Sequence, residues 1–268
     1  MKRSLITLCA ALALAPAAAS AGGGPSPGVV LGWNGVLARD GTVRYVTLPA
    51  GPRTVVAAVK SEGGQVERFA ALRGSYGIPM VAFDGTTDGL TADGRTLLLA
   101  GVSTNPGRLS SRFALLDVRR MRVRQTFGLR GAFSFDALSP SGKTLFLVEH
   151  LGGRQDPIRY RVRAYDLAAG RLLRRPIADK RLGVSVMRGI PASRATGREG
   201  RWAYTLYQGG DHPFVHALDT VRRVAVCIDL PHDARRASRL SLNGSRLLVL
   251  GQRGQTVAAI DARTLRLR

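Results

Sequence analysis

Acidic and histidine side chains occur together in two short segments of this sequence, and their types are those that bind divalent metal ions. Glu149 and His150 begin the segment EHLGGRQDPIR, and Asp211 and His212 lie in the segment YQGGDHPF. Carboxylate oxygens and imidazole nitrogens both coordinate divalent cations. If the fold brings the two segments together, these four side chains could form a metal site.

The same segments also carry side chains that would suit a non-catalytic binding surface. Aromatic and arginine side chains are the usual anchors of protein interfaces, and Tyr207, Phe214 and Arg154 would take that role here. No spacing among the acidic and histidine residues is diagnostic of a metal site. We therefore predict a binding module that is not an enzyme and has no catalytic residue, metal or cofactor. The candidate binding residues are Glu149, His150, Arg154, Asp156, Tyr207, Asp211, His212 and Phe214.

Other sequence signatures of enzymes are weak or missing. Gly142-Lys143-Thr144 resembles the end of a phosphate-binding loop, but Ala137 stands where that motif requires glycine. A strand, and not the required helix, is expected after Thr144, so the match is accidental. The motifs H-E-x-x-H and C-x-x-C do not occur in the chain.

The elements that would position the candidate residues repeat along the chain. Five modules each contain a turn with glycine between two apolar strands, and the glycines are 53, 48, 58 and 44 residues apart. The five turns are Asp40-Gly41, Asp93-Gly94, Ser141-Gly142, Glu199-Gly200 and Asn243-Gly244. Self-similarity at a period of tens of residues indicates a repeat architecture, and repeats made only of strands favour the blades of a β-propeller.

The third module shows the strand pattern most clearly. Its four strands are expected at residues 133–138, 144–149, 159–167 and 171–177. The second is almost continuously apolar, as expected for a strand that is covered on both faces. In the third, Tyr160, Val162 and Ala164 alternate with arginine and tyrosine, which is typical of a strand with one buried face. Burial therefore decreases from the inner strands to the outer ones, as a propeller blade requires.

These turns and strands resemble the YVTN and WD40-like β-propeller repeats over residues 29–268. Ile260-Asp261-Ala262-Arg263-Thr264-Leu265 and Tyr165-Asp166-Leu167-Ala168-Ala169-Gly170 carry the resemblance, although the Trp-Asp dipeptide of true WD40 blades is absent. An aspartate can accept a backbone N–H two residues further on and so stabilise a tight turn. We therefore interpret four aspartates as structural: Asp117, Asp166, Asp219 and Asp261.

The resemblance implies an all-β propeller of four-stranded blades. The five modules predict five blades, or six if terminal segments pair into a further partial blade; a β-sandwich is the main structural alternative. In a propeller, the loops after each second strand share one face with the connections between blades, and loops on one face commonly carry function. These loops are residues 101–111, 149–159, 207–214 and 251–255. Lactonase-like propellers hold a divalent ion near such a place, so the alternative function is a metal-dependent lactonase or esterase.

The N-terminus has the pattern of a secretory signal peptide. Lys2 and Arg3 precede an apolar run over residues 5–15, and the segment ends Ala19-Ser20-Ala21. We predict a signal peptide at residues 1–21, a flexible lead-in at residues 22–28 and a propeller domain at residues 29–268. Cleavage would leave Cys227 as the one cysteine, so no internal disulfide is expected. The predicted location is secreted, periplasmic or in the cell envelope, with no transmembrane anchor.

The chain is strongly basic, and such a charge can attract an anionic partner. The formal net charge is +22, and four of the 40 basic residues are lysine. The arginines are dispersed near the third and fourth strand of each module, where charge protects sheet edges from pairing with other chains. We therefore expect at most weak contact with an anionic polymer and no specific nucleic-acid binding. The predicted partner of this monomer is a protein, a peptide or an envelope glycan.

Overall fold

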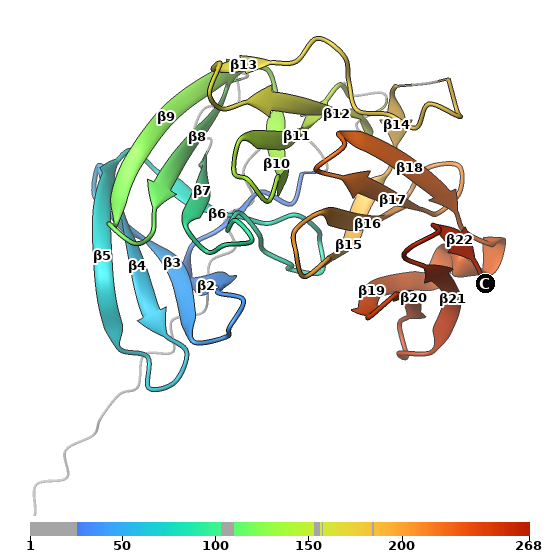
Figure 1. Cartoon of the computed structure of the whole chain (residues 1–268), viewed down its shortest axis with the longest axis horizontal. Coiled ribbons are helices and arrows are strands. Elements are labelled where there is room, and N and C mark those ends of the chain that lie inside the picture. Colours follow the sequence, from blue (N-terminus) through green and yellow to red (C-terminus); the bar gives the residue numbers. More distant parts are fainter. Residues whose placement is uncertain (1–25, 103–109, 153–155, 157, 184) are drawn as a thin grey trace, which may run out of the picture.

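The computed structural model describes residues 26–102, 110–152, 156, 158–183 and 185–268. These residues form five antiparallel sheets that follow one another around a common centre (Figure 1). The predicted signal peptide and residues 22–25 of the predicted lead-in lie outside the described residues, so their assignment remains a prediction. Within the described part of the chain, no helix has the length and apolarity needed to cross a bilayer.

Each sheet is one blade built around four antiparallel strands, and the strands run outward from the centre in sequence order. Blade 1 contains β2 (Gly32–Leu37), β3 (Val43–Ala50), β4 (Arg53–Lys60) and β5 (Val66–Arg73). Blade 2 contains β6 (Tyr76–Pro79), β7 (Thr96–Gly101), β8 (Ser110–Asp117) and β9 (Arg122–Arg130). Blade 3 contains β10 (Phe133–Leu138), β11 (Thr144–His150), β12 (Arg159–Asp166) and β13 (Arg171–Leu172).

The last two blades follow the same order. Blade 4 contains β15 (Ile190–Thr196), β16 (Trp202–Gln208), β17 (Phe214–Asp219) and β18 (Val224–Asp229). Blade 5 contains β19 (Ala237–Asn243), β20 (Arg246–Gly251), β21 (Thr256–Asp261) and β22 (Arg266–Leu267). A short 3₁₀ helix, η1 (His232–Arg236), connects them. The expectation of an all-β propeller with five blades is confirmed.

Two short strands depart from the four-strand pattern. The start of the propeller is divided between two blades, because β1 (Val29–Val30) pairs with β6 and becomes the innermost strand of blade 2, whereas β2 belongs to blade 1. No sixth partial blade therefore forms from the described N-terminal residues. In blade 3, β14 (Met187–Arg188) pairs with the start of β12.

The five turns that mark the repeat have a backbone conformation that favours glycine. All five glycines lie between the first and second main strand of a blade, with φ between +58° and +74°. L-residues with a side chain rarely adopt this left-handed conformation, so glycine is favoured at these points. The five glycines are Gly41, Gly94, Gly142, Gly200 and Gly244.

The four aspartates stabilise the turns between the third and fourth strands, as predicted. In each turn, one carboxylate oxygen accepts the backbone N–H groups two and three residues further on, at 2.9–3.1 Å. The residue four positions after the aspartate has a positive φ in every case. Those residues are Met121, Gly170, Arg223 and Leu265. Asp219, for example, accepts N–H groups from Val221 and Arg222.

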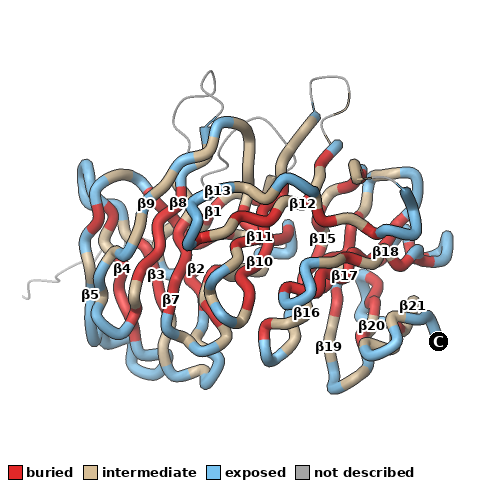
Figure 2. Tube along the Cα trace, turned by 45° about the horizontal axis from the view of Figure 1, so that its top comes forward, coloured by how far each residue is buried: buried red, intermediate tan, exposed pale blue. Residues whose placement is uncertain are grey.

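Apolar residues on facing sheets form the core. Each of the four interfaces between successive blades contains a cluster of buried side chains, and Figure 2 shows buried stretches along the strands of all five sheets. Among the described residues, no such cluster joins blade 5 to blade 1. The described parts of the five blades therefore form an array that is joined by four apolar interfaces, with no apolar cluster of described residues between its ends.

A hairpin between β6 and β7 crosses the centre of this array. Met80 pairs with Thr87 at its base. At its tip, the N–H groups of Phe83 and Asp84 donate to the carbonyls of Pro191 and Ala192 in β15, at 2.9 and 3.1 Å. On the other side, the Thr87 hydroxyl donates to the carbonyl of Gly35 in β2 at 3.0 Å. The hairpin thus connects blades 1, 2 and 4 by hydrogen bonds.

We expect Gly244→Ala to lower the free energy of unfolding by about 1 kcal/mol, because alanine would be held at φ +58°. A Cβ there meets no atom within 4 Å, so the cost would come from the backbone alone. Gly128→Ala is the matched control, because Gly128 has no positive φ and its Cβ would make only ordinary contacts. Urea unfolding measures both variants. Equal stability of Gly244→Ala and the wild type would show that this turn does not require glycine.

Candidate functional site

The predicted loop residues Asp156 and Asp211 lie on one face of the molecule, on either side of Arg188. Asp156 is in the loop between β11 and β12, and Asp211 is in the loop between β16 and β17. The Arg188 guanidinium in β14 is 3.2 Å from a carboxylate oxygen of Asp156 and 3.5 Å from one of Asp211. We call Asp156, Arg188 and Asp211 the Arg188 rim. The predicted anchor Arg154 lies outside the described residues.

Glu149 is held by two arginines of its own blade. Its carboxylate accepts hydrogen bonds from Arg161 at 2.7 and 3.0 Å and from Arg163 at 2.8 Å. Burial acts to raise the pKa of Glu149, but the hydrogen bonds from Arg161 and Arg163 outweigh it and hold the pKa below its ordinary value. The carboxylate is therefore ionised and already engaged with two cations.

The two candidate histidines, His150 and His212, are in separate environments. His150 shares a hydrogen bond of 2.9 Å with the Ser134 hydroxyl, and burial lowers its pKa to about 4. His212 is exposed and its ring nitrogen is 2.8 Å from an Asp229 carboxylate oxygen. Among the described residues, no group of three or more His, Cys, Asp or Glu side chains is arranged to hold a metal ion.

The predicted aromatic anchors lie in the core between blades 3 and 4. Tyr207 is 2% exposed and Phe214 is 8% exposed. Their rings stack with centroids 5.3 Å apart, and Tyr207 also stacks on Tyr160 at 4.6 Å. Tyr207 near the end of β16 and Phe214 at the start of β17 thus flank the loop that carries Asp211. The binding role of the eight candidate residues remains a prediction.

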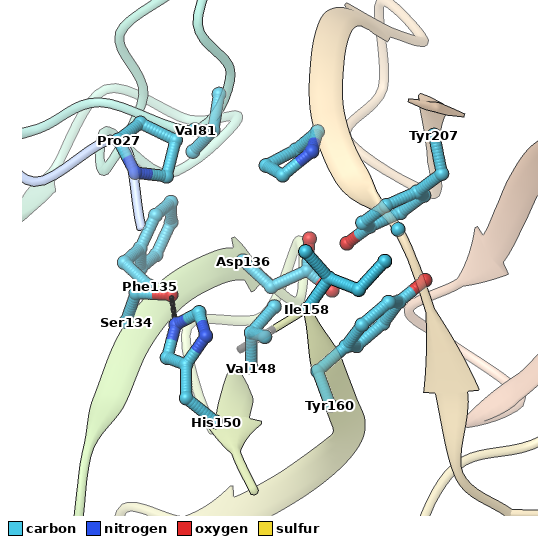
Figure 3. A pocket seen from close by; sticks show the side chains of 12 residues that line it. Pro27, Val81, Ser134, Phe135, Asp136, Val148, His150, Ile158, Tyr160 and Tyr207 are labelled. Atoms are coloured by element: carbon cyan, nitrogen blue, oxygen red, sulfur yellow. Dashed lines mark hydrogen bonds between the residues drawn. The ribbon is translucent and has the colours of Figure 1, made fainter. Parts of the chain in front are cut away.

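Sequence reasoning missed a buried polar cluster at the centre. Arg194 in β15 forms an ion pair with Asp136 in β10, and their side chains are 2% and 3% exposed. Figure 3 shows the Tyr207 hydroxyl beside the Asp136 carboxylate, and the Tyr160 ring lies alongside the Tyr207 ring. An aspartate inside the apolar strand FSFDAL and an arginine inside IPASRAT were the signals that could have revealed this cluster.

Several polar atoms of this cluster have no hydrogen-bond partner among the described residues. They are Asp136 Oδ2, Tyr160 Oη, Arg194 Nε, Arg194 Nη1 and His216 Nε2. Beside them is a cavity of about 10 Å³ lined by Asp136, Tyr160, Tyr207 and His150. That volume is close to the minimum that holds one water molecule, so an internal water could hydrogen-bond to the unpartnered oxygens.

A much larger cavity lies on the opposite face from the Arg188 rim, near the glycine turns between first and second strands. It has a volume of about 590 Å³, within the usual range of small-molecule sites. The end of β2, the crossing hairpin and the end of β15 form its walls. The lining residues are Val36, Leu37, Arg39, Thr86, Thr87, Asp88, Leu90, Arg194, Thr196, Gly197 and Arg198.

Comparisons with known proteins show the fold. No family model matches the chain, and no curated protein matches it. A solved structure of a functionally unknown protein from Desulfotomaculum acetoxidans DSM 771 aligns with a TM-score of 0.53 and 15% identity, over 87% of this chain and 67% of that one. Hydrazine synthase from Kuenenia stuttgartiensis aligns with a TM-score of 0.51 and 16% identity, over 87% and 69%. The Dos1 propeller aligns with a TM-score of 0.50 and 11% identity, over 85% and 54%.

These alignments support the propeller fold and leave the narrower YVTN assignment as an expectation. Each solved chain is longer than the part that this chain matches. At identities of 11–16%, the similarity extends to the fold alone. The chain is a β-propeller with five blades.

We expect the protein to lose stability as the pH falls from 6.5 to 4. Burial lowers the pKa values of His150 and His216 to about 4, whereas unfolded histidine titrates near pH 6.5. Between these values the unfolded chain binds protons that the folded chain does not, so protonation favours unfolding, while above pH 6.5 the effect is absent. The loss should be roughly 2–3 kcal/mol for each buried imidazole at pH 4.5.

Urea unfolding at pH 7 and pH 4.5 measures this loss. His216→Gln should reduce the difference between the two pH values, whereas the exposed His232→Gln should leave it unchanged. An equal pH dependence in His216→Gln and the wild type would contradict the assignment of His216 as a buried neutral group.

We expect Asp136→Asn to lower the free energy of unfolding by about 3–5 kcal/mol, because it would leave the buried Arg194 without a counter-charge. The double variant Asp136→Leu with Arg194→Met should be more stable than Asp136→Asn, because it removes both charges. Chemical unfolding of the two variants checks the prediction. A double variant that is less stable than Asp136→Asn would contradict this account. It would show that the ion pair stabilises the fold by more than the mutual neutralisation of two buried charges.

Proposed function

We propose that this protein is a non-catalytic binding module that recognises a protein, a peptide or an envelope glycan through the Arg188 rim. The rim combines a partly exposed cation with two carboxylates at 3.2 and 3.5 Å from it. Asp211 is 81% exposed at its side chain and Arg188 is 48% exposed, so both remain accessible to a partner. Exposed charges of both signs on a rigid support suit the recognition of a polar partner.

One observation favours a binding function over metal-dependent hydrolysis for this face. The carboxylates and imidazoles of this face interact with the protein's own side chains. Glu149 contacts Arg161 and Arg163, and Asp156 contacts Arg188. A hydrolytic metal centre needs several such groups to converge with an open coordination position. The described part of this face instead distributes them among separate ion pairs.

The proposed location follows from the N-terminal sequence. Lys2, Arg3 and the apolar run after them have the composition of a secretory signal, and the proposal places the mature protein in the periplasm, the envelope or the medium. A partner in that compartment would be an envelope protein, a peptide or a glycan. The dispersed arginines would add weak attraction to anionic polymers, which salt screens.

We expect Arg188→Ala with Asp211→Ala to weaken binding to a purified envelope fraction at least tenfold. Both side chains are largely exposed, so the double variant should fold. The matched control is Glu62→Ala with Arg263→Ala, which also removes one acid and one base from exposed turns. Surface plasmon resonance against purified sacculi fragments and against envelope proteins separates glycan from protein partners. Equal binding by the two double variants would contradict the proposed surface.

Metal analysis of the same purified protein distinguishes the binding function from metal-dependent hydrolysis. Elemental analysis and thermal unfolding in EDTA and in added calcium detect a resident metal. The proposal predicts no change of melting temperature on chelation. A tightly bound divalent ion, together with ester or lactone hydrolysis that EDTA abolishes, would replace binding by hydrolysis as the function of this face.

A further inference from the structure

The cavity of about 590 Å³ is a separate feature from the Arg188 rim. Arg39 and Arg198 belong to turns that follow the first main strands of blades 1 and 4. The rim's carboxylates lie in loops that follow second strands, and Arg188 lies in the connection between blades 3 and 4. The two sites therefore occupy opposite faces.

Positive charge predominates around this cavity. Arg39 and Arg198 are exposed at its mouth, and neither has a carboxylate within 4.0 Å among the described residues. Arg194 lies in its wall, where Asp136 neutralises it while its Nε and Nη1 atoms lack partners among the described residues. Two guanidinium groups at the mouth are therefore available to an anion.

One acidic residue opposes this charge. Asp88 lines the cavity and accepts the Gly89 N–H at 2.7 Å. Burial raises the pKa of Asp88, and the positive charges of Arg194 and Arg39 act against that rise. A single carboxylate offsets one positive charge at most, so the cavity keeps a net positive charge even when Asp88 is ionised.

The remaining lining suits a small molecule that is partly polar and partly apolar. Thr196 supplies a hydroxyl group, whereas the hydroxyls of Thr86 and Thr87 already donate to Asp84 and Gly35. Val36, Leu37 and Leu90 supply apolar contacts. The wall is fixed in place, because Thr87 donates to Gly35 and the hairpin tip pairs with β15. A preformed pocket avoids the entropic cost of ordering its loops on binding.

We propose that this cavity binds a small molecule through an oxyanion head group, either a phosphate or a carboxylate. Arginine is the side chain best suited to such groups, because its planar guanidinium donates two parallel hydrogen bonds to adjacent oxygens. Arg39 and Arg198 hold the oxyanion at the mouth, and the Thr196 hydroxyl donates a further hydrogen bond. The apolar lining takes the remainder of the molecule.

Isothermal titration calorimetry tests the proposal with three probes: inorganic phosphate, pyrophosphate and citrate, each at a constant ionic strength of about 0.15 M. We expect one of them to saturate at one equivalent. Arg39→Ala and Arg198→Ala should each weaken that binding about tenfold or more, and both residues are exposed, so folding should be preserved. Circular dichroism of each variant verifies the fold.

Two further variants test whether the binding depends on the charge of the cavity. Asp88→Asn keeps an oxygen for the Gly89 N–H and removes the negative charge, so it should tighten binding. Arg263→Ala removes an exposed arginine from a turn of blade 5 and should leave binding unchanged. Pyrophosphate binding without citrate binding would identify a phosphate ligand, and the reverse would identify a carboxylate ligand.

The proposal fails if none of the three anions saturates at one equivalent. It also fails if Arg263→Ala weakens binding as much as Arg39→Ala does, because that result would indicate non-specific attraction to a basic protein. Neither outcome depends on the envelope-binding experiment, so failure of the cavity proposal and failure of the rim proposal can be distinguished.

Discussion

The buried ion pair between Arg194 and Asp136 is the contact on which the centre of this propeller depends. Successive blades are joined by apolar packing, which has little directionality. The ion pair, in contrast, requires β10 and β15 to meet in one register, because separating two charges in a dry interior is costly. The crossing hairpin then adds hydrogen bonds from Phe83 and Asp84 to β15. Together these contacts fix the innermost strands relative to one another.

The fixed centre explains how one fold presents two different surfaces. On one face, the loops around Arg188 carry exposed charges of both signs above a core of stacked aromatic rings. On the other face, β2, the hairpin and β15 enclose a cavity with arginines at its mouth. Two faces with different shapes and charges suit recognition of two different kinds of ligand. The basic composition alone would not have distinguished them, since arginine is spread over the whole chain.

The sequence predicted the features that depend on local chemistry. Glycine between the first and second strands of each blade, and aspartate between the third and fourth strands of blades 2 to 5, leave a clear signal, because the backbone conformation there restricts which residues fit. The features that depend on packing between distant segments could not be predicted in this way. Tyr207 stands in a loop-like stretch of sequence, yet it is buried because Tyr160 and Phe214 lie on both sides of it. The cavity was missed for the same reason, since its walls come from three blades.

Hydrogen exchange of the hairpin amides tests the central claim most directly. If polar contacts fix the centre, the N–H groups of Phe83 and Asp84 should exchange as slowly as amides in the middle of β16, because both require cooperative opening of the blades. The exposed turn at residues 61–64 provides the fast reference. Exchange of Phe83 and Asp84 at the rate of that turn would contradict the account, because the hairpin would then open without disturbing the blades that it connects.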